Sequence, residues 1–541
     1  MQLGRGLLTA PAAGEAPAPA AAGVAARRAR RPPGLLVGAV AVAVVLLLPL
    51  AFLALEAVDD GWSSVGPLVF RHLTGTLLWD TVSLAVVVTA CCAVLGTLAA
   101  YFVERTDLPG RRAWAVLVVV PVGIPDFAVA FGWKSLFGGI GGFWGAALVM
   151  TLAVYPLVYL PVAASLRNAD PGQEEASRSL GVGRLATFWR VTLGQARLAV
   201  LGGCVLVALV LLSEYGAFEI LGYRTFTTEI FTEAQVGFDA PAACGLSLVL
   251  VVLGLLVLSG EGASRGRGRA SRTGPMAARV AQPHRLGRAV VPVVGGFGVL
   301  VVTALGVPVG AIVYWLFRTT TSTLPAAASV ASAAAHTAAY SAGAGLLATA
   351  GALPVAILSV RHPGRLAMVL ERSSYLVLAV PGVVIALAFT YASERYAAGF
   401  LYQTAWLLIV AYAVMFFPLA LVAVRASVAR APVGLEEVGR SLGRSRLAVL
   451  RQVTLPLIAP GLAAAFCLVF LEAVTELTAT LMLIPTNAET LATQFWAFES
   501  NISYHQAAPY AAVMVAIAAV PSYVLGRWFD RLPASAGAVA R

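Results

Sequence analysis

Three carboxylates lie within or beside apolar stretches of this 541-residue chain. Glu214 and Glu476 each follow an apolar run and are separated by 262 positions, and Asp126 comes directly after Pro125. A carboxylate at membrane depth usually has a function, and its oxygens are ligands that hard cations prefer. The alternatives are that these residues bind backbone groups freed where a helix breaks, or that they are solvated loop charges. We predict Glu214, Glu476 and Asp126 as candidates for a transport pathway or its gate.

A second polar feature is a stretch of sequence that occurs twice, and its two copies are also 262 residues apart. Residues 174–194 and 436–456 are identical at 12 of 21 positions. Each copy contains a Glu pair, a Leu-Gly step and a Val-Thr-Leu exit. Ordinary solvent-exposed loops are the alternative, but such loops have no reason to keep these features at the same spacing in both copies. The repeat therefore predicts a specific task for both copies.

The local chemistry of the first copy predicts a short helix. Asp170 can cap a helix that begins at Pro171, with Gln173 completing a capping box. Gly181 is placed to end the helix in a left-handed conformation. A second short helix carrying Leu185, Phe188 and Thr192 is expected to return the chain to the apolar region. The second copy begins at Pro432 after Ala431, which is a poorer cap.

The composition identifies the chain as a membrane protein that crosses the bilayer many times. Hydrophobic residues make up 59% of the chain and charged residues only 12%, whereas soluble domains carry about 25% charge. The net charge of +11 could suggest nucleic acid. In such an apolar chain, basic cytoplasmic loops explain it better, so the lipid bilayer is expected as a partner and nucleic acid is not.

Twelve apolar runs predict an all-α fold of twelve transmembrane helices in two tandem halves of the same orientation. A cleaved signal peptide is the alternative for the first run, which is long for that purpose. The expected domains are a disordered tail at 1–34, a first half at 35–259 with its polar loop at 167–197, an Arg/Gly-rich linker at 260–288, a second half at 289–530 with its polar loop at 425–456, and a tail at 531–541.

The distribution of basic residues predicts the orientation. With the N-terminus in the cytoplasm, only five of the 37 Lys and Arg residues fall outside, which leaves 37 − 5 = 32 on the cytoplasmic side. Such a bias sets membrane orientation. Both copies of the repeat then face the cytoplasm, both termini are cytoplasmic, and the interface between the halves is the natural place for a pathway.

The repeated stretch resembles the signature loop of the membrane subunits of binding-protein-dependent bacterial ABC importers. That loop reads E-A-A-x-x-x-G, nine further residues, then I-x-L-P. The first copy departs from it at Gly194, where Pro is usual, and the second at Val438 and Gly439. In that family the loop forms a coupling helix that docks on the ATPase subunit. The resemblance implies that role for residues in both copies: Glu174, Glu175, Ala176, Gly181, Glu436, Glu437, Val438 and Gly443.

The fused arrangement is most similar to the ferric-iron group of these permeases, because residues 475–485 and 489–496 resemble the iron-type sequences. The resemblance implies a permease subunit in the bacterial inner membrane that works by alternating access. Its partners would be two copies of a cytoplasmic ATPase and an extracytoplasmic solute-binding protein. Thiamine or a phosphonate remains an alternative substrate, and a twelve-span ion-coupled secondary transporter is the alternative of another class.

The chain is not expected to be an enzyme. A Walker A loop needs Gly-Lys followed by Ser or Thr, and the only lysine, Lys134, follows Trp133. The five cysteines show no Cys-x-x-Cys pair and no accompanying histidine at ligand spacing. No cofactor and no resident metal site are therefore expected, and ATP hydrolysis must come from partner subunits.

Overall fold

The computed structural model describes residues 33–59, 66–67, 69–167, 169–266, 284–318, 325–397 and 399–531. The regular elements in these ranges are all helices, joined by turns and irregular segments, apart from one isolated parallel β-bridge between Thr106 and His284. The tails predicted at 1–34 and 531–541 fall almost wholly outside the described residues. The all-α fold class is confirmed for the part that the structure describes.

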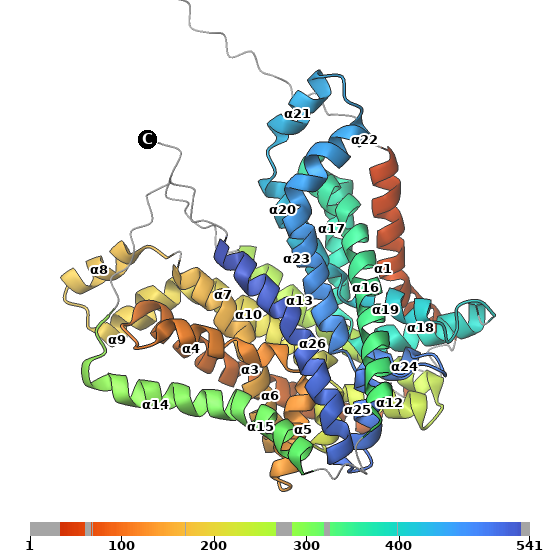
Figure 1. Ribbon diagram of the computed structural model, residues 1–541, viewed down its shortest axis with the longest axis horizontal. Helices are drawn as coiled ribbons and strands as arrows, with labels where there is room; N and C mark the ends of the chain where they lie inside the picture. Colours follow the sequence, from red (N-terminus) through yellow and green to blue (C-terminus); the bar gives the residue numbers. More distant parts are fainter. Residues whose placement is uncertain are drawn as a thin grey trace, which may run out of the picture.

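The first half contains long apolar helices interrupted by short ones (Figure 1). Its α-helices are α1 (Pro33–Asp59), α3 (His72–Arg105), α4 (Arg111–Leu117), α5 (Asp126–Leu136), α6 (Gly142–Val154), α7 (Pro156–Arg167), α8 (Pro171–Ser179), α9 (Arg184–Thr187), α10 (Leu193–Ser213), α11 (Gly216–Ile220), α12 (Phe226–Gln235) and α13 (Ala240–Gly266). Two turns of other helix types are η1 (Val120–Gly123) and η2 (Phe188–Thr192).

The second half repeats this order. Its α-helices are α14 (Val290–Val301), α15 (Val307–Phe317), α16 (Ala327–Arg361), α17 (Arg365–Leu376), α18 (Gly382–Ala397), α19 (Ala405–Met415), α20 (Phe417–Arg430), α21 (Val433–Ser441), α22 (Arg446–Val449), α23 (Leu455–Val474), α24 (Thr478–Leu483), α25 (Leu491–Glu499) and α26 (Tyr504–Arg531). Its turns of other helix types are η3 (Gly287–Ala289), η4 (Val302–Gly306), η5 (Val377–Ala379) and η6 (Leu450–Thr454).

In the part of the chain that the structure describes, eight helices are long and apolar enough to cross a membrane, and the number rises to eleven if each of three bent pairs is one span. The bend is 94° before α5 and 103° before α18. A proline precedes the second helix at both bends, Pro125 and Pro381, and proline cannot continue a straight helix. The twelfth expected span, 507–526, lies within α26. The chain is thus a multi-pass helical protein with eight to eleven candidate spans.

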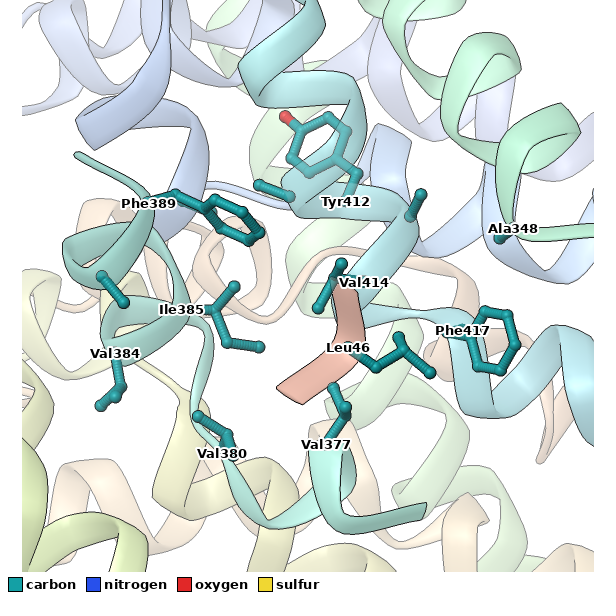
Figure 2. Close-up of a cluster of buried hydrophobic side chains, with 14 of the residues drawn as sticks. Leu46, Ala348, Val377, Val380, Val384, Ile385, Phe389, Tyr412, Val414 and Phe417 are labelled. Carbon is teal, nitrogen blue, oxygen red and sulfur yellow. The ribbon is translucent and has the colours of Figure 1, made fainter. Parts of the chain in front are cut away.

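The first helix of each half packs on the other half, which the sequence pattern does not reveal. Helix α1 contacts α16, α17 and α18. In Figure 2, Leu46 of α1 lies among Val377, Val414 and Phe417 of the second half. Conversely, α15 packs on α5 of the first half. A Cβ at Gly132 would lie 2.6 Å from Cα of Pro308, so glycine permits this close approach.

Two hydrophobic cores result, and each contains elements of both halves. One core joins Ala39, Leu46 and Phe52 of α1 to the second-half helices. The other joins Phe297 and Ile312, from α14 and α15, to the first-half helices. The halves are therefore interlocked, and the cavity between them and the two short polar helices outside them are positioned by one continuous structure.

Coupling helices and an acidic cavity between the halves

Helices α8 and α21 begin the two copies of the repeated stretch; α21 lies at the top of the molecule in Figure 1 and α8 at its left edge. Asp170 caps α8 as expected, because its Oδ1 accepts from the Gly172 amide at 2.9 Å. The expected capping box is not formed: the side-chain oxygen of Gln173 instead accepts from Gln195 at 2.9 Å. Helix α21 begins at Val433 rather than Pro432, and Pro432 provides no side-chain cap.

Both helices end in the predicted glycine. Gly181 has a φ of 80° and Gly443 a φ of 79°. The Gly181 amide donates to the carbonyl of Arg178 and the Val182 amide to that of Ser177. The same two bonds recur after α21, from Gly443 and Arg444. This pair of bonds is the Schellman ending that favours a left-handed glycine, so the turn is built identically in both copies.

The return to the membrane differs from the prediction. The expected separate second helix is only the four-residue α9, which continues through a π-helical turn, η2, into α10. The second half has the same turn at η6. A π turn inserts an extra residue into the helix and commonly marks a functional position. In both copies this turn ends at the threonine of the Val-Thr-Leu exit, Thr192 or Thr454, and both threonines are buried.

Glu174 is the centre of a buried polar cluster that holds α8. Its side chain is only 3% exposed, and Thr192 donates to its Oε1 at 2.9 Å. The carboxylate lies 3.6 Å from Nη2 of Arg105, at the end of α3, and 3.6 Å from Nη2 of Arg178. Nε2 of His284 lies 3.3 Å away. One carboxylate therefore connects α8 to α3, to the start of α10 and to the segment before α14.

Charge pairing decides the ionisation of this buried group. Burial raises the pKa of Glu174, but the hydrogen bond with His284, the Arg105 charge and the Thr192 hydrogen bond together bring the pKa below its usual value. Arg105 is equally buried, and its Nε and Nη2 have no hydrogen-bond partner among the described residues. Arg105 therefore depends on Glu174 for charge compensation.

His284 lies at the C-terminal end of the predicted linker, and its position has defined structure. Its amide donates to the Arg105 carbonyl at 2.8 Å, and its carbonyl accepts from the Asp107 amide at 3.0 Å. Oδ1 of Asp107 accepts from the Leu286 amide at 2.8 Å. Helix α13 also extends to Gly266. The linker prediction thus stays a prediction for 267–283, which lies outside the described residues.

Helix α21 has a simpler anchor. Arg361, the last residue of α16, donates to Oε1 of Glu436 at 3.1 Å and to the Ala431 carbonyl at 2.8 Å. Within the described parts of the chain, this is the single charged partner of Glu436. From the sequence, both glutamates of each pair were expected to have the same role. In the structure their environments differ, because Glu174 and Glu436 face inward while Glu175 and Glu437 are exposed.

The exposed surfaces of the two helices differ in polarity. Ala176 is exposed on α8, and the corresponding Val438 on α21 is 55% exposed. Val433 and Leu435 add apolar surface to α21, where α8 has Pro171 and Gln173. Leu180 and Leu442, which precede the glycines, are exposed on both helices. The second copy therefore presents the more apolar exposed surface.

The predicted carboxylates Glu214 and Glu476 occupy equivalent positions between the halves. Oε1 of Glu214 accepts from the Ala217 amide at 2.7 Å, and Oε1 of Glu476 accepts from the Ala479 amide at 2.8 Å. Each side chain thereby satisfies the beginning of a short helix, α11 or α24, after a membrane helix breaks. One carboxylate oxygen of each residue therefore binds a backbone amide that is left free where a helix breaks, which is one of the alternatives considered for these residues.

The same two glutamates line a cavity of about 210 Å³ with Asp126 and with Glu472, which was not singled out from the sequence. Asp126 begins α5, and its second-half counterpart Gly382 begins α18 and donates its amide to Ser213 at 3.0 Å. The cavity lining contains no Lys, Arg or His. In the described chain, no three His, Cys, Asp or Glu side chains converge as a metal-ligand set.

Comparison with known proteins identifies this architecture. The family model "Binding-protein-dependent transport system inner membrane component" matches residues 92–260 and again 348–535. The chain belongs to this family. It is therefore the inner-membrane, multi-pass permease component of a transport system that works with a solute-binding protein and an ATPase, and it is not the catalytic subunit. This membership sets aside the alternative of an ion-coupled secondary transporter.

Individual relatives match either nearly the whole chain or about 40% of it. The chain is 36% identical over 503 residues to the Haemophilus influenzae Fe(3+)-transport system permease protein FbpB 2, covering 92% of this chain and 99% of that protein. It is 29% identical to the Salmonella typhimurium sulfate transport system permease protein CysT, over 40% of this chain and 86% of the relative. The chain is also 29% identical to the sulfate transport system permease protein CysW of Synechocystis, over 40% of this chain and 85% of that relative. These sulfate relatives are about the size of one half.

Proposed function

We propose that this permease carries ferric iron across the inner membrane by alternating access. The observation that carries the proposal is the 36% identity, over nearly the full length of both chains, to a protein named as an Fe(3+)-transport permease. The acidic cavity adds a physical argument, because carboxylate oxygens are preferred ligands of hard cations. Among its described residues the lining has no Lys, Arg or His to attract an anion such as sulfate or a phosphonate.

The proposed architecture is twelve spans in two halves, 35–259 and 289–530, with α26 as the twelfth span and both termini in the cytoplasm. An extracytoplasmic binding protein delivers the ion, and two ATPase subunits dock on α8 and α21 through Glu175, Ala176, Glu437 and Val438. ATP binding draws the coupling helices together, and the halves rock about their interface. The interlocked helices α1 and α14–α15 support this scheme, since they make each half move with an element of the other.

We further propose that Glu214, Glu476, Asp126 and Glu472 line the path of the ion. Each short helix capped by Glu214 or Glu476 lies where a membrane helix breaks, so movement there would open or close the cavity. Among the described residues, no three His, Cys, Asp or Glu side chains are close enough together to hold a metal ion tightly. Weak binding is compatible with transport, because a transported ion must leave as readily as it enters.

Uptake measurements test the substrate. A strain lacking its own ferric importer would receive this permease with its ATPase and binding protein, and uptake of radiolabelled ferric iron, thiamine, a phosphonate and sulfate would be compared. We expect iron uptake alone to rise. Uptake of another solute without iron uptake would overturn the substrate proposal.

Substitution tests the path. Glu476→Gln and Glu214→Gln remove one cavity charge each, and we expect iron uptake to fall about ten-fold or more while the ATPase still co-purifies. Glu489→Gln, at an exposed carboxylate before α25, is the matched control and should leave uptake unchanged. If the cavity variants transport normally, these residues do not line the path.

A further inference from the structure

The cluster around His284 connects the first coupling helix to the second half of the chain. His284 precedes η3 and α14, which begin the second half, yet its side chain contacts two residues of α8: Nε2 is 2.6 Å from Nη2 of Arg178 and 3.3 Å from Oε2 of Glu174. The helices that follow it pack across the first half through Trp114–Phe297 and through α5. His284 thus stands between α8 and an element of the other half.

The backbone of this segment is fixed independently of the His284 side chain. The parallel bridge to Arg105 and Asp107 uses the His284 amide and carbonyl, and the Asp107 carboxylate holds the Leu286 amide. Three hydrogen bonds therefore set the path of the chain at the end of α3. The imidazole is then placed over Glu174 without further ordering, so its contacts cost little conformational entropy.

Both imidazole nitrogens lie within hydrogen-bond distance of Nη2 of Arg178, Nδ1 at 3.1 Å and Nε2 at 2.6 Å, and Nε2 also faces Glu174. Nε2 accepts from Arg178 when it is unprotonated, or donates to Glu174 when it carries a proton, and it cannot do both at once. Either arrangement connects the segment before α14 to α8, through the guanidinium or through the carboxylate. The connection is therefore kept whichever form the ring adopts.

We infer that His284 is a positioning residue for energy coupling, which transmits movement of α8 to α14 and α15. The inference needs only the family role of the coupling helices and goes beyond the proposed substrate. It gives the end of the linker a mechanical task. When an ATPase subunit moves α8, the Glu174 cluster moves α3 and α10, and His284 moves the first helices of the second half with them.

The test uses the intact complex with its ATPase subunits in lipid nanodiscs, and it measures ATP hydrolysis without any solute, so the result does not depend on the iron proposal. The variants are His284→Ala, His284→Gln and, as the matched control, His72→Ala at the exposed opposite end of α3. A glutamine side chain offers an acceptor to Arg178 and a donor to Glu174, so it should replace the imidazole.

We expect His284→Ala to lower the maximal hydrolysis rate by about five-fold or more, a typical size for coupling between sites. The ATP concentration at half-maximal rate and the amount of co-purified ATPase should stay unchanged, because the docking surface is intact. His284→Gln should restore most of the rate, and His72→Ala should behave as wild type. A normal rate in His284→Ala, an equal loss in His284→Gln, or loss of the ATPase subunits from His284→Ala would each overturn the inference.

Discussion

The two coupling helices share a shape but differ in how they are held. Both α8 and α21 end in the same left-handed glycine and return to the membrane through a π turn. Glu174, however, contacts α3, the start of α10 and the segment before α14, whereas Arg361 is the charged partner seen for Glu436 within the described structure. Duplication has preserved the geometry presented to a partner, while the anchoring behind it has diverged.

The difference suggests a division of labour between the halves. The first helix is strongly anchored and has a polar exposed surface, and the second is more simply anchored and has a more apolar one. Strong anchoring transmits force, and apolar exposed area contributes affinity when it is buried. The first helix is therefore the better transmitter and the second the better docking site, a contrast that the next three predictions test.

The largest expected effect comes from removing the inner glutamates. Glu174→Ala leaves Arg105 buried without a counter-charge, which should lower the free energy of local opening of α8 by about 3–5 kcal/mol. Glu436→Ala leaves Arg361 hydrogen-bonded to the Ala431 carbonyl, so the free energy of local opening of α21 should fall by only about 1.5–3 kcal/mol. Hydrogen exchange of the amides in each helix measures both. Equal losses would remove the difference in anchoring.

The helix ends should respond equally. Alanine at Gly181 or Gly443 meets no atom within 4 Å, but it must adopt the left-handed conformation, which costs about 1–2 kcal/mol. Hydrogen exchange should show the same loss in both helices. Gly183→Ala is the control, because Gly183 has open space and no positive φ. Unequal losses at the two glycines would show that the shared turn is not equivalent in the two halves.

The smallest effect concerns the docking surface. Val438→Ala removes exposed apolar surface from α21 and should weaken ATPase binding by about 1 kcal/mol, or roughly five-fold in Kd. Binding of purified ATPase subunit to the permease in nanodiscs measures this change. Val291→Ala, at an exposed valine of α14, is the control and should bind normally. If Val438→Ala also binds normally, apolar contact at this position contributes nothing to docking.

Local features of the site were predictable from the sequence because neighbouring residues determine them. The Asp170 cap and both glycine turns follow from chain-local hydrogen bonding, and the 262-residue repeat located both helices. The Gln173 half of the capping box was wrong, because Gln195, distant in the sequence, binds that side chain. The π turns gave no signal, since an apolar pattern does not distinguish them from ordinary helix.

Long-range features could not be read from the sequence. Nothing in the local pattern indicates that Arg105 and His284 converge on Glu174, or that Asp107 holds the segment before α14. The exchange of α1 and α14 between halves was equally hidden, because an apolar helix is compatible with any apolar neighbour. Glu472 was also missed, since its place beside Asp126 depends on how the halves pack.

The packing of α1 has a consequence for how the protein is made. This helix is synthesised before the rest of the first half, but its neighbours α16, α17 and α18 are synthesised only after the whole first half. A single apolar helix is tolerated in lipid, because the acyl chains are as apolar as its side chains. Helix α1 must therefore remain in the bilayer without its native contacts during much of translation. Assembly is completed late, when α1 meets the early helices of the second half.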